Sequence, residues 1–175
     1  MAVHIQEVVG KYVGPIWEQY AQNDLGLDEA QAFKSGEKAI PAVWAGVINH
    51  VGDENAAKRF FNLLTGTNVD TKWLDAGVLQ GDKLAQVQKL GGQWLGLLFG
   101  NRGSEVEQAV AQDAGLEDAQ ASGIMALAIP TVLAALKQWI QQNQSGQHQF
   151  YGQLVGQESF FSQIFSPQVL AALGI

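Results

Sequence analysis

Two pairs of adjacent acidic residues are the first part of this sequence whose chemistry stands out. Asp28-Glu29 and Glu117-Asp118 each follow a Gly-Leu step and precede a long apolar segment. Two carboxylates that face each other can divide the roles of general acid and general base. Consecutive residues of a helix point to different sides, however, and the macrodipole stabilises carboxylates at a helix start. We therefore interpret both pairs as residues that begin helices rather than as catalytic residues.

The other residues that commonly act in catalysis or bind metals and phosphate are either absent or lack the required spacing. The sequence has no cysteine, which excludes a disulfide framework, a thiolate zinc site and a cysteine nucleophile. His4, His50 and His148 are far apart, and none lies in a metal-ligand spacing such as H-E-x-x-H. The chain also has no G-x-S-x-G motif and no phosphate-binding glycine motif. We therefore expect no catalytic, metal-binding or cofactor-binding residues, and no cofactor.

Composition and charge exclude several classes of protein. The chain has 175 residues, of which 47% are hydrophobic and 15% charged, and its net charge is −7. This hydrophobic fraction excludes a disordered chain, and the acidic balance argues against nucleic acid as a partner. Residues 1–11 lack the pattern of a signal peptide. The longest apolar stretch that could suggest a membrane span is Trp94–Phe99, which is far shorter than the roughly 20 residues needed. We expect a soluble, cytoplasmic protein without a membrane span.

The sequence contains a copy of itself at an offset of 89 residues. Residues 18–45 align without a gap on residues 107–134, and thirteen of these 28 positions are identical. Chance would give about two identities at ordinary residue frequencies. We therefore predict an internal duplication with two similar halves, residues 1–89 and 90–175, that pack as one compact unit.

Each half shows the same series of helix signals. A helix with apolar residues at three- and four-residue steps ends at Gly26 in the first half and at Gly115 in the second, where glycine suits a left-handed cap. A second, more apolar helix follows and contains Pro41 or Pro130, so we expect a break or kink at both prolines. No segment shows the alternation of a β-strand. The predicted fold is an all-α, internally duplicated multi-helical bundle whose two halves have Pro-kinked central helices.

The segment between the halves, residues 90–103, has an unusual glycine spacing. Gly92, Gly96 and Gly100 recur every four residues and would share one face of a helix, with Trp94 and Phe99 beside them. Such spacing lets two helix backbones approach closely. In water each glycine costs about 1 kcal/mol relative to alanine, so a packing contact must offset the cost. That contact is either a helix of the same chain or a second copy of the protein, and these five residues are the candidate interface.

The central part of the chain resembles the YidB-like family, bacterial proteins grouped under a domain of unknown function. The resemblance rests on L-G-G-x-x-L-G-x-L-F-G at residues 90–100, the Gly115-Leu116 cap and A-x-P-x-V-L-A-A-L at residues 128–136, and it covers roughly residues 20–140. It implies a small helical bacterial protein without an established activity. No catalytic residue is implied by it.

Three functions are compatible with these features. The first is a non-enzymatic protein for protein–protein interaction or self-assembly, because the glycine-spaced segment and the apolar C-terminal residues 158–175 could meet a partner. The second is a carrier of a small apolar ligand in a cleft between the halves. The third is an enzyme with an unrecognised site, which would need a solvent-reached pocket with converging polar side chains. The C-terminal segment either closes the core of the second half or is offered to a neighbour.

Overall fold

Helices form every regular element in the described part of this computed structural model. It describes residues 5–23, 25–50, 53–66, 69–75, 78, 80–143, 146, 152, 165 and 167–173. The α-helices are α1 (Ile5–Asn23), α2 (Glu29–His50), α3 (Glu54–Thr65), α4 (Gly81–Phe99), α5 (Gly103–Asp113), α6 (Asp118–Gln142) and α9 (Pro167–Leu173), with the 3-10 turns η1 (Thr71–Leu74) and η2 (Gly100–Arg102). No strand occurs in these residues, so the all-α prediction is confirmed.

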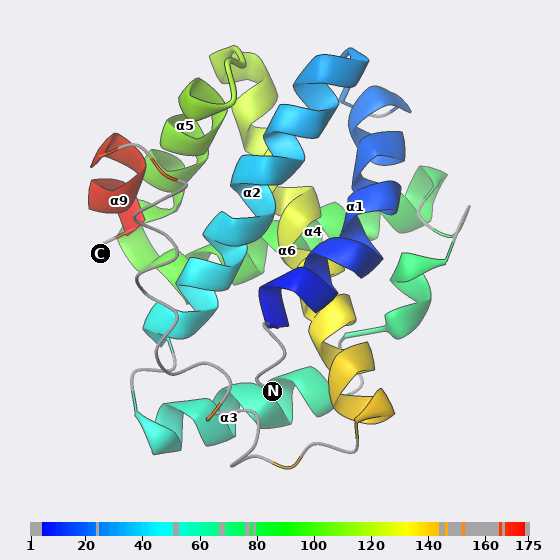
Figure 1. Ribbon diagram of the computed structural model, residues 1–175, viewed down its shortest axis with the longest axis vertical. Coiled ribbons are helices and arrows are strands. Elements are labelled where there is room, and N and C mark those ends of the chain that lie inside the picture. The colour runs from blue at the N-terminus through cyan, green and yellow to red at the C-terminus, as the bar shows by residue number, and fades with distance from the viewer. Residues whose placement is uncertain are drawn as a thin grey trace.

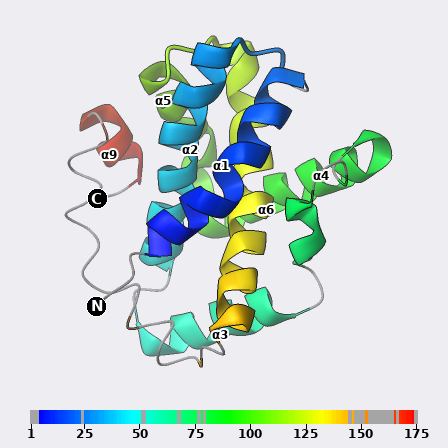
Figure 2. The ribbon, with the colours of Figure 1, turned by 45° about the vertical axis from the view of Figure 1, so that its right-hand side comes forward.

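Helix α6 is the centre of the structure. It packs against α1, α2, α3, α4, α5 and η1, and it runs through the middle of these helices in both ribbon views (Figures 1 and 2). From Ile124 to Leu136 its side chains are nearly all apolar, and most are fully buried. A helix that is apolar all round must be enclosed by other elements, which explains why the rest of the chain surrounds this one.

Part of α6 also has the length and composition of a membrane-spanning helix. This segment is residues 123–142, and 78% of the window is buried inside the protein. The expectation that Trp94–Phe99 is the longest apolar stretch of this kind is therefore wrong. The apolar surface of α6 is covered by neighbouring helices, and the absence of a membrane span stays a prediction.

A close contact between two helix backbones occurs where α4 crosses α6. A Cβ atom on Gly91 would collide with the backbone carbonyl of Ala126. This carbonyl lies four residues before Pro130, whose nitrogen carries no hydrogen to donate to it. Gly91 therefore places only a Cα hydrogen against an oxygen that lacks its usual helical donor, where a weak C–H···O contact is favourable. The glycine and the proline together make this close crossing sterically and electrostatically acceptable.

Helix α1 packs against α2 through a buried tryptophan. The ring of Trp17 lies on the backbone of Gly36, where a Cβ atom would come within 2.7 Å of the ring. The indole N–H donates to Ser35 Oγ at 2.9 Å, and this hydroxyl donates to the carbonyl of Ala32 at 2.8 Å. Both buried polar groups are thus satisfied, which avoids the cost of an unpaired donor.

The two aligned segments form the same order of elements. α1 and α2 are joined by a short loop and pack together, as do α5 and α6. Gly26 and Gly115 adopt left-handed conformations with φ of 68° and 74°, as predicted for helix caps. The Trp17–Ser35 pair, however, has apolar residues at the corresponding positions of the second segment. The structure does not confirm the internal duplication, which stays a prediction from the sequence.

Both central helices continue past their prolines. Pro41 lies inside α2 and Pro130 inside α6, and neither helix is interrupted. The alternative of a break at these positions is therefore wrong. Burial of the surrounding apolar side chains stabilises each helix by more than the loss of one hydrogen bond costs.

The two sequence halves contribute to one core. The expected boundary between residues 89 and 90 lies inside α4, and helices from both sides of it pack on α6. Polar contacts between the halves include Lys137 Nζ, which donates to the carbonyls of Gly66 and Val69, each at 2.6 Å, and the Lys38–Asp113 ion pair at 3.4 Å. Lys137 therefore connects α6, in the second half, to the segment that follows α3 in the first half.

The end of the chain is docked where the structure describes it. Helix α9 packs against α5 and α2 (Figure 1), and Phe165 and Val169 are buried there. For these residues the prediction that the C-terminal segment closes the core is confirmed. Residues 153–164 and 174–175 lie outside the described part of the chain.

The α4–α6 crossing predicts opposite effects for two neighbouring glycines. Gly91→Ala should destabilise the fold by about 1–3 kcal/mol because the methyl group meets the Ala126 carbonyl. Gly92→Ala should stabilise it by about 1 kcal/mol, since a Cβ atom there has no neighbour within 4 Å. Urea unfolding of both variants at low protein concentration measures the difference. Equal effects of the two substitutions would contradict the crossing.

Candidate functional site

The first acidic pair begins a helix, as its position in the sequence indicates. Asp28 Oδ1 accepts a hydrogen bond from the backbone N–H of Gln31 at 2.8 Å, and Gln31 Oε1 accepts one from the N–H of Asp28 at 3.1 Å. This reciprocal pair is a capping box at the start of α2. The interpretation of Asp28 as a capping residue is therefore confirmed. Glu117 directly precedes α6, and the side chain of Asp118 lies outside the described part of the chain.

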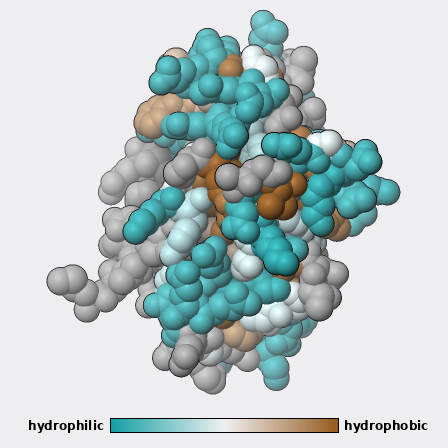
Figure 3. Space-filling model, turned by 90° about the vertical axis from the view of Figure 1, so that its right-hand side faces the viewer, coloured by the Kyte–Doolittle hydropathy of each residue, from teal (hydrophilic) through white to brown (hydrophobic). Residues whose placement is uncertain are grey.

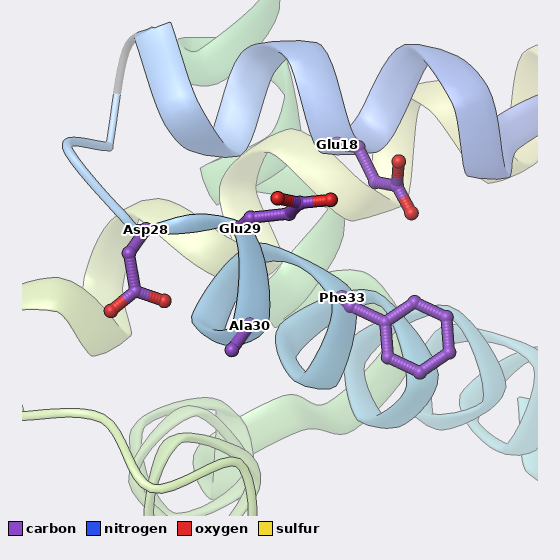
Figure 4. A pocket seen from close by; sticks show the side chains of 5 residues that line it. All are labelled: Glu18, Asp28, Glu29, Ala30 and Phe33. Atoms are coloured by element: carbon purple, nitrogen blue, oxygen red, sulfur yellow. The ribbon is translucent and has the colours of Figure 1, made fainter.

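An open hollow between α1 and α2 lies next to this capping box. This hollow of about 580 Å³ is lined by Glu18, Asp28, Glu29, Ala30 and Phe33. In Figure 4 the side chain of Glu29 extends toward Glu18, Asp28 is turned toward the other end, and the ring of Phe33 projects from the next turn of α2. Neither Glu18 nor Glu29 forms an ion pair with another described residue.

This hollow has the chemistry of a surface that attracts cations. The unpaired carboxylates create a negative potential, and an exposed phenyl ring offers both apolar area and a cation–π face. Phe33 is 55% exposed, so water reaches the whole region. The sequence does not reveal this hollow, because Glu18 and Phe33 come from different helices.

The five candidate interface residues separate into two groups on α4. Trp94 is buried and its ring centroid lies 6.1 Å from that of Trp73. Phe99 packs on the backbone of Gly46 in α2. Both aromatic residues therefore make contacts within the chain, where Trp94 is buried and Phe99 is partly buried.

The three glycines of the candidate interface lie on the outer face of α4. Gly92, Gly96 and Gly100 are exposed, and a Cβ atom on any of them would meet nothing within 4 Å. Packing against another helix of the same chain, one of the two alternatives, is therefore wrong for these positions. Gly91, which the spacing argument passed over, makes that contact instead. Gly100 has a separate role, because it ends α4 with a φ of 58°.

The outer face of α4 is small, uncovered and partly apolar. Besides Gly92 and Gly96 it carries Lys89 and Leu97, and Leu97 is 46% exposed. In Figure 3, which shows one side of the protein, hydrophilic residues surround a small hydrophobic area. Among the described residues, Leu97 and Phe33 are the large hydrophobic side chains with high exposure.

Among the residues that the structure describes, Glu107 and His50 have perturbed pKa values. Desolvation by burial raises the pKa of Glu107 on α5 to about 7. Burial, and then the positive charge of Arg59, lowers the pKa of His50, whose ring meets that of Phe60 edge-on at 6.0 Å. His50 is the last residue of α2. The sequence gives no signal for either shift, because both depend on which neighbours exclude water.

The described residues contain no group of three or more His, Asp or Glu side chains that could hold a metal ion. His4 and His148 lie outside the described part of the chain, and so do the side chains of Asp118 to Ser122. The expectation of no metal and no cofactor stays a prediction.

These features define a class: an all-helical protein organised around one apolar helix, with two uncovered surface regions of different chemistry. The chain belongs to the family described as bacterial protein of unknown function (DUF937), whose model matches residues 7–138. This membership confirms the resemblance to the YidB-like family. The chain matches no curated protein and no solved structure.

The pKa of Glu107 predicts a pH-dependent stability. Its folded-state pKa of about 7 lies above the ordinary value of 4.5, so the folded state binds this proton more tightly than the unfolded state does. The contribution to stability is complete below about pH 4.5 and is lost as the pH rises through 7. Glu107→Gln should therefore raise the thermal midpoint, relative to the wild type, more at pH 8 than at pH 5. Glu105→Gln on the exposed side of α5 is the control, and the same pH pattern in that variant would refute the assignment.

Proposed function

We propose that this protein is non-enzymatic and associates with itself through the outer face of α4. The observation that carries the proposal is the exposure of Gly92 and Gly96 in the middle of a helix, with nothing near the position of either Cβ atom. Neither glycine has the positive φ that makes glycine necessary at Gly100.

The free energy of the helix supports this proposal. Two exposed glycines inside a helix cost together about 2 kcal/mol relative to two alanines. No contact within the described chain offsets that cost. Close approach of another helix offsets the cost of the two glycines, because glycine lets two backbones come near enough for extensive van der Waals contact. The half-exposed side chain of Leu97 on the same helix would be buried in such a contact.

The two other hypotheses have less support. A carrier of an apolar ligand needs an apolar cavity, whereas the hollow between α1 and α2 is open and lined mainly by carboxylates. An enzyme needs a reactive group beside its binding residues, and the carboxylates of the hollow include Asp28, which is already used as a helix cap. The absence of nucleic acid as a partner and a cytoplasmic location remain predictions from the charge and the sequence pattern.

The proposal is tested by substituting the glycine at the centre of the face. Multi-angle light scattering of the wild type across a concentration series should show a mean mass that rises above that of one chain. Gly96→Leu should shift this rise to at least tenfold higher concentration, because the added side chain holds the two helices apart. Its thermal midpoint should be at least that of the wild type, since the leucine replaces an exposed helical glycine.

A matched control separates this effect from added hydrophobic surface. Gln108→Leu places the same side chain on the exposed face of α5 and should leave the association unchanged. The proposal is wrong if the wild type stays a monomer at all concentrations, or if Gly96→Leu associates as the wild type does.

A further inference from the structure

Helix α9 is attached to the molecule differently from the other described α-helices. Helices α1 to α5 all pack on α6, whereas α9 packs mainly on α5 and α2. It lies at the outer edge of the molecule in both ribbon views (Figures 1 and 2). The family match ends at residue 138, before α9. Helix α9 therefore covers a surface of α5 and α2 rather than a side of α6.

Apolar side chains on one side of this segment are buried. Val169 and Ala172, three residues apart in α9, are buried, and so is Phe165, two residues before the helix begins. Ala171, on the other side of the helix, is exposed. Residues 165–173, which we call the α9 segment, contain no charged side chain. Apolar anchors of this kind on a short helix characterise the docking of a peptide helix on the surface of a protein.

Helix α9 is too short to be helical by itself. It has seven residues, and isolated helices shorter than about 12 residues are only marginally stable in water. Its helical structure therefore depends on the contact with α5 and α2. Release of the α9 segment uncovers a few apolar side chains and leaves the packing around α6 in place. Such an element opens at a lower free energy than the core of a protein does.

The chain ahead of the α9 segment is long enough to reach another copy. Residues 143–164 lie between the end of α6 and Phe165. An extended chain spans up to about 3.5 Å per residue, so this stretch can reach about 75 Å. That reach exceeds the width of a folded chain of this length. The α9 segment of one copy can therefore dock on α5 and α2 of its own chain or of a neighbour.

We propose that the surface of α5 and α2 under α9 is an exchangeable docking site, and that its second occupant is the α9 segment of another copy. This inference is separate from the proposed contact through α4. Each chain has one segment and one site, so two copies that exchange segments regain both contacts. The chain's own segment is present at an effective concentration on the order of 1 mM, so exchange between copies becomes substantial above about this protein concentration.

A fluorescent peptide of residues 165–173 tests this site on the full-length chain. In the double variant Phe165→Ser with Val169→Ser, the chain's own segment should no longer dock, because two buried apolar side chains become polar. The peptide should bind this variant at least tenfold more tightly than it binds the wild type, whose own segment competes for the site. Fluorescence anisotropy measures both affinities. The same peptide carrying Val169→Ser is the matched control and should not bind.

Two measurements without the peptide complete the test. Native-state hydrogen exchange of the wild type should show the backbone amides of α9 exchanging at least tenfold faster than those of α6, because α9 is released without global unfolding. Small-angle scattering of Gly96→Leu above about 1 mM should show dimers, and the same chain with Phe165→Ser and Val169→Ser added should stay monomeric. Since Gly96→Leu removes the proposed α4 contact, failure of the proposed function leaves these results unchanged.

Three results would overturn the inference. The first is a peptide that binds the wild type and the double variant equally, or binds neither while circular dichroism shows both to be folded. The second is exchange of the α9 amides at the rate of the α6 amides, which is decisive even if the double variant does not fold. The third is Gly96→Leu that stays monomeric above about 1 mM, which excludes another copy as the second occupant.

Discussion

The packing of α1 to α5 depends on the enclosure of α6. Its residues from Ile124 to Leu136 are nearly all apolar and nearly all buried, so this helix needs neighbours on all sides. The strictest requirement is at the crossing with α4, where Gly91 meets the carbonyl of Ala126 that Pro130 leaves without a helical donor. A side chain at position 91 would separate α4 from α6 and open the core there.

The glycines of α4 therefore have two different roles. On its inner side Gly91 permits the approach of α6, and Trp94 and Phe99 complete the packing against η1 and α2. On its outer side Gly92 and Gly96 have no neighbour, beside an exposed leucine and unpaired bases. In the proposed self-association, a helix of another copy covers this side of α4.

Local signals in the sequence predicted much of the fold. The all-α class, the cap at Asp28, the left-handed Gly26 and Gly115 and the apolar faces of α2 and α6 all follow from residues near each other in the chain. The continuity of α2 and α6 past their prolines did not follow, because burial by distant helices decides it. Which of the adjacent residues Gly91 and Gly92 contacts α6 likewise depends on how α4 is rotated about its own axis against α6. The hollow at Phe33 and the pKa of Glu107 require tertiary contacts that no local pattern encodes.

Zero-length cross-linking of the wild-type protein tests the self-association through the outer face of α4 most directly. A carbodiimide joins a lysine amine to a carboxylate only where the two are in contact, and an equal mixture of ¹⁴N- and ¹⁵N-labelled protein identifies links between copies by mass spectrometry. The account predicts links that join Lys89, on the outer face of α4, to a carboxylate of another copy, and it predicts that Gly96→Leu abolishes them at the same concentration. Links between copies that join other surfaces, or none at concentrations where the protein associates, would contradict it.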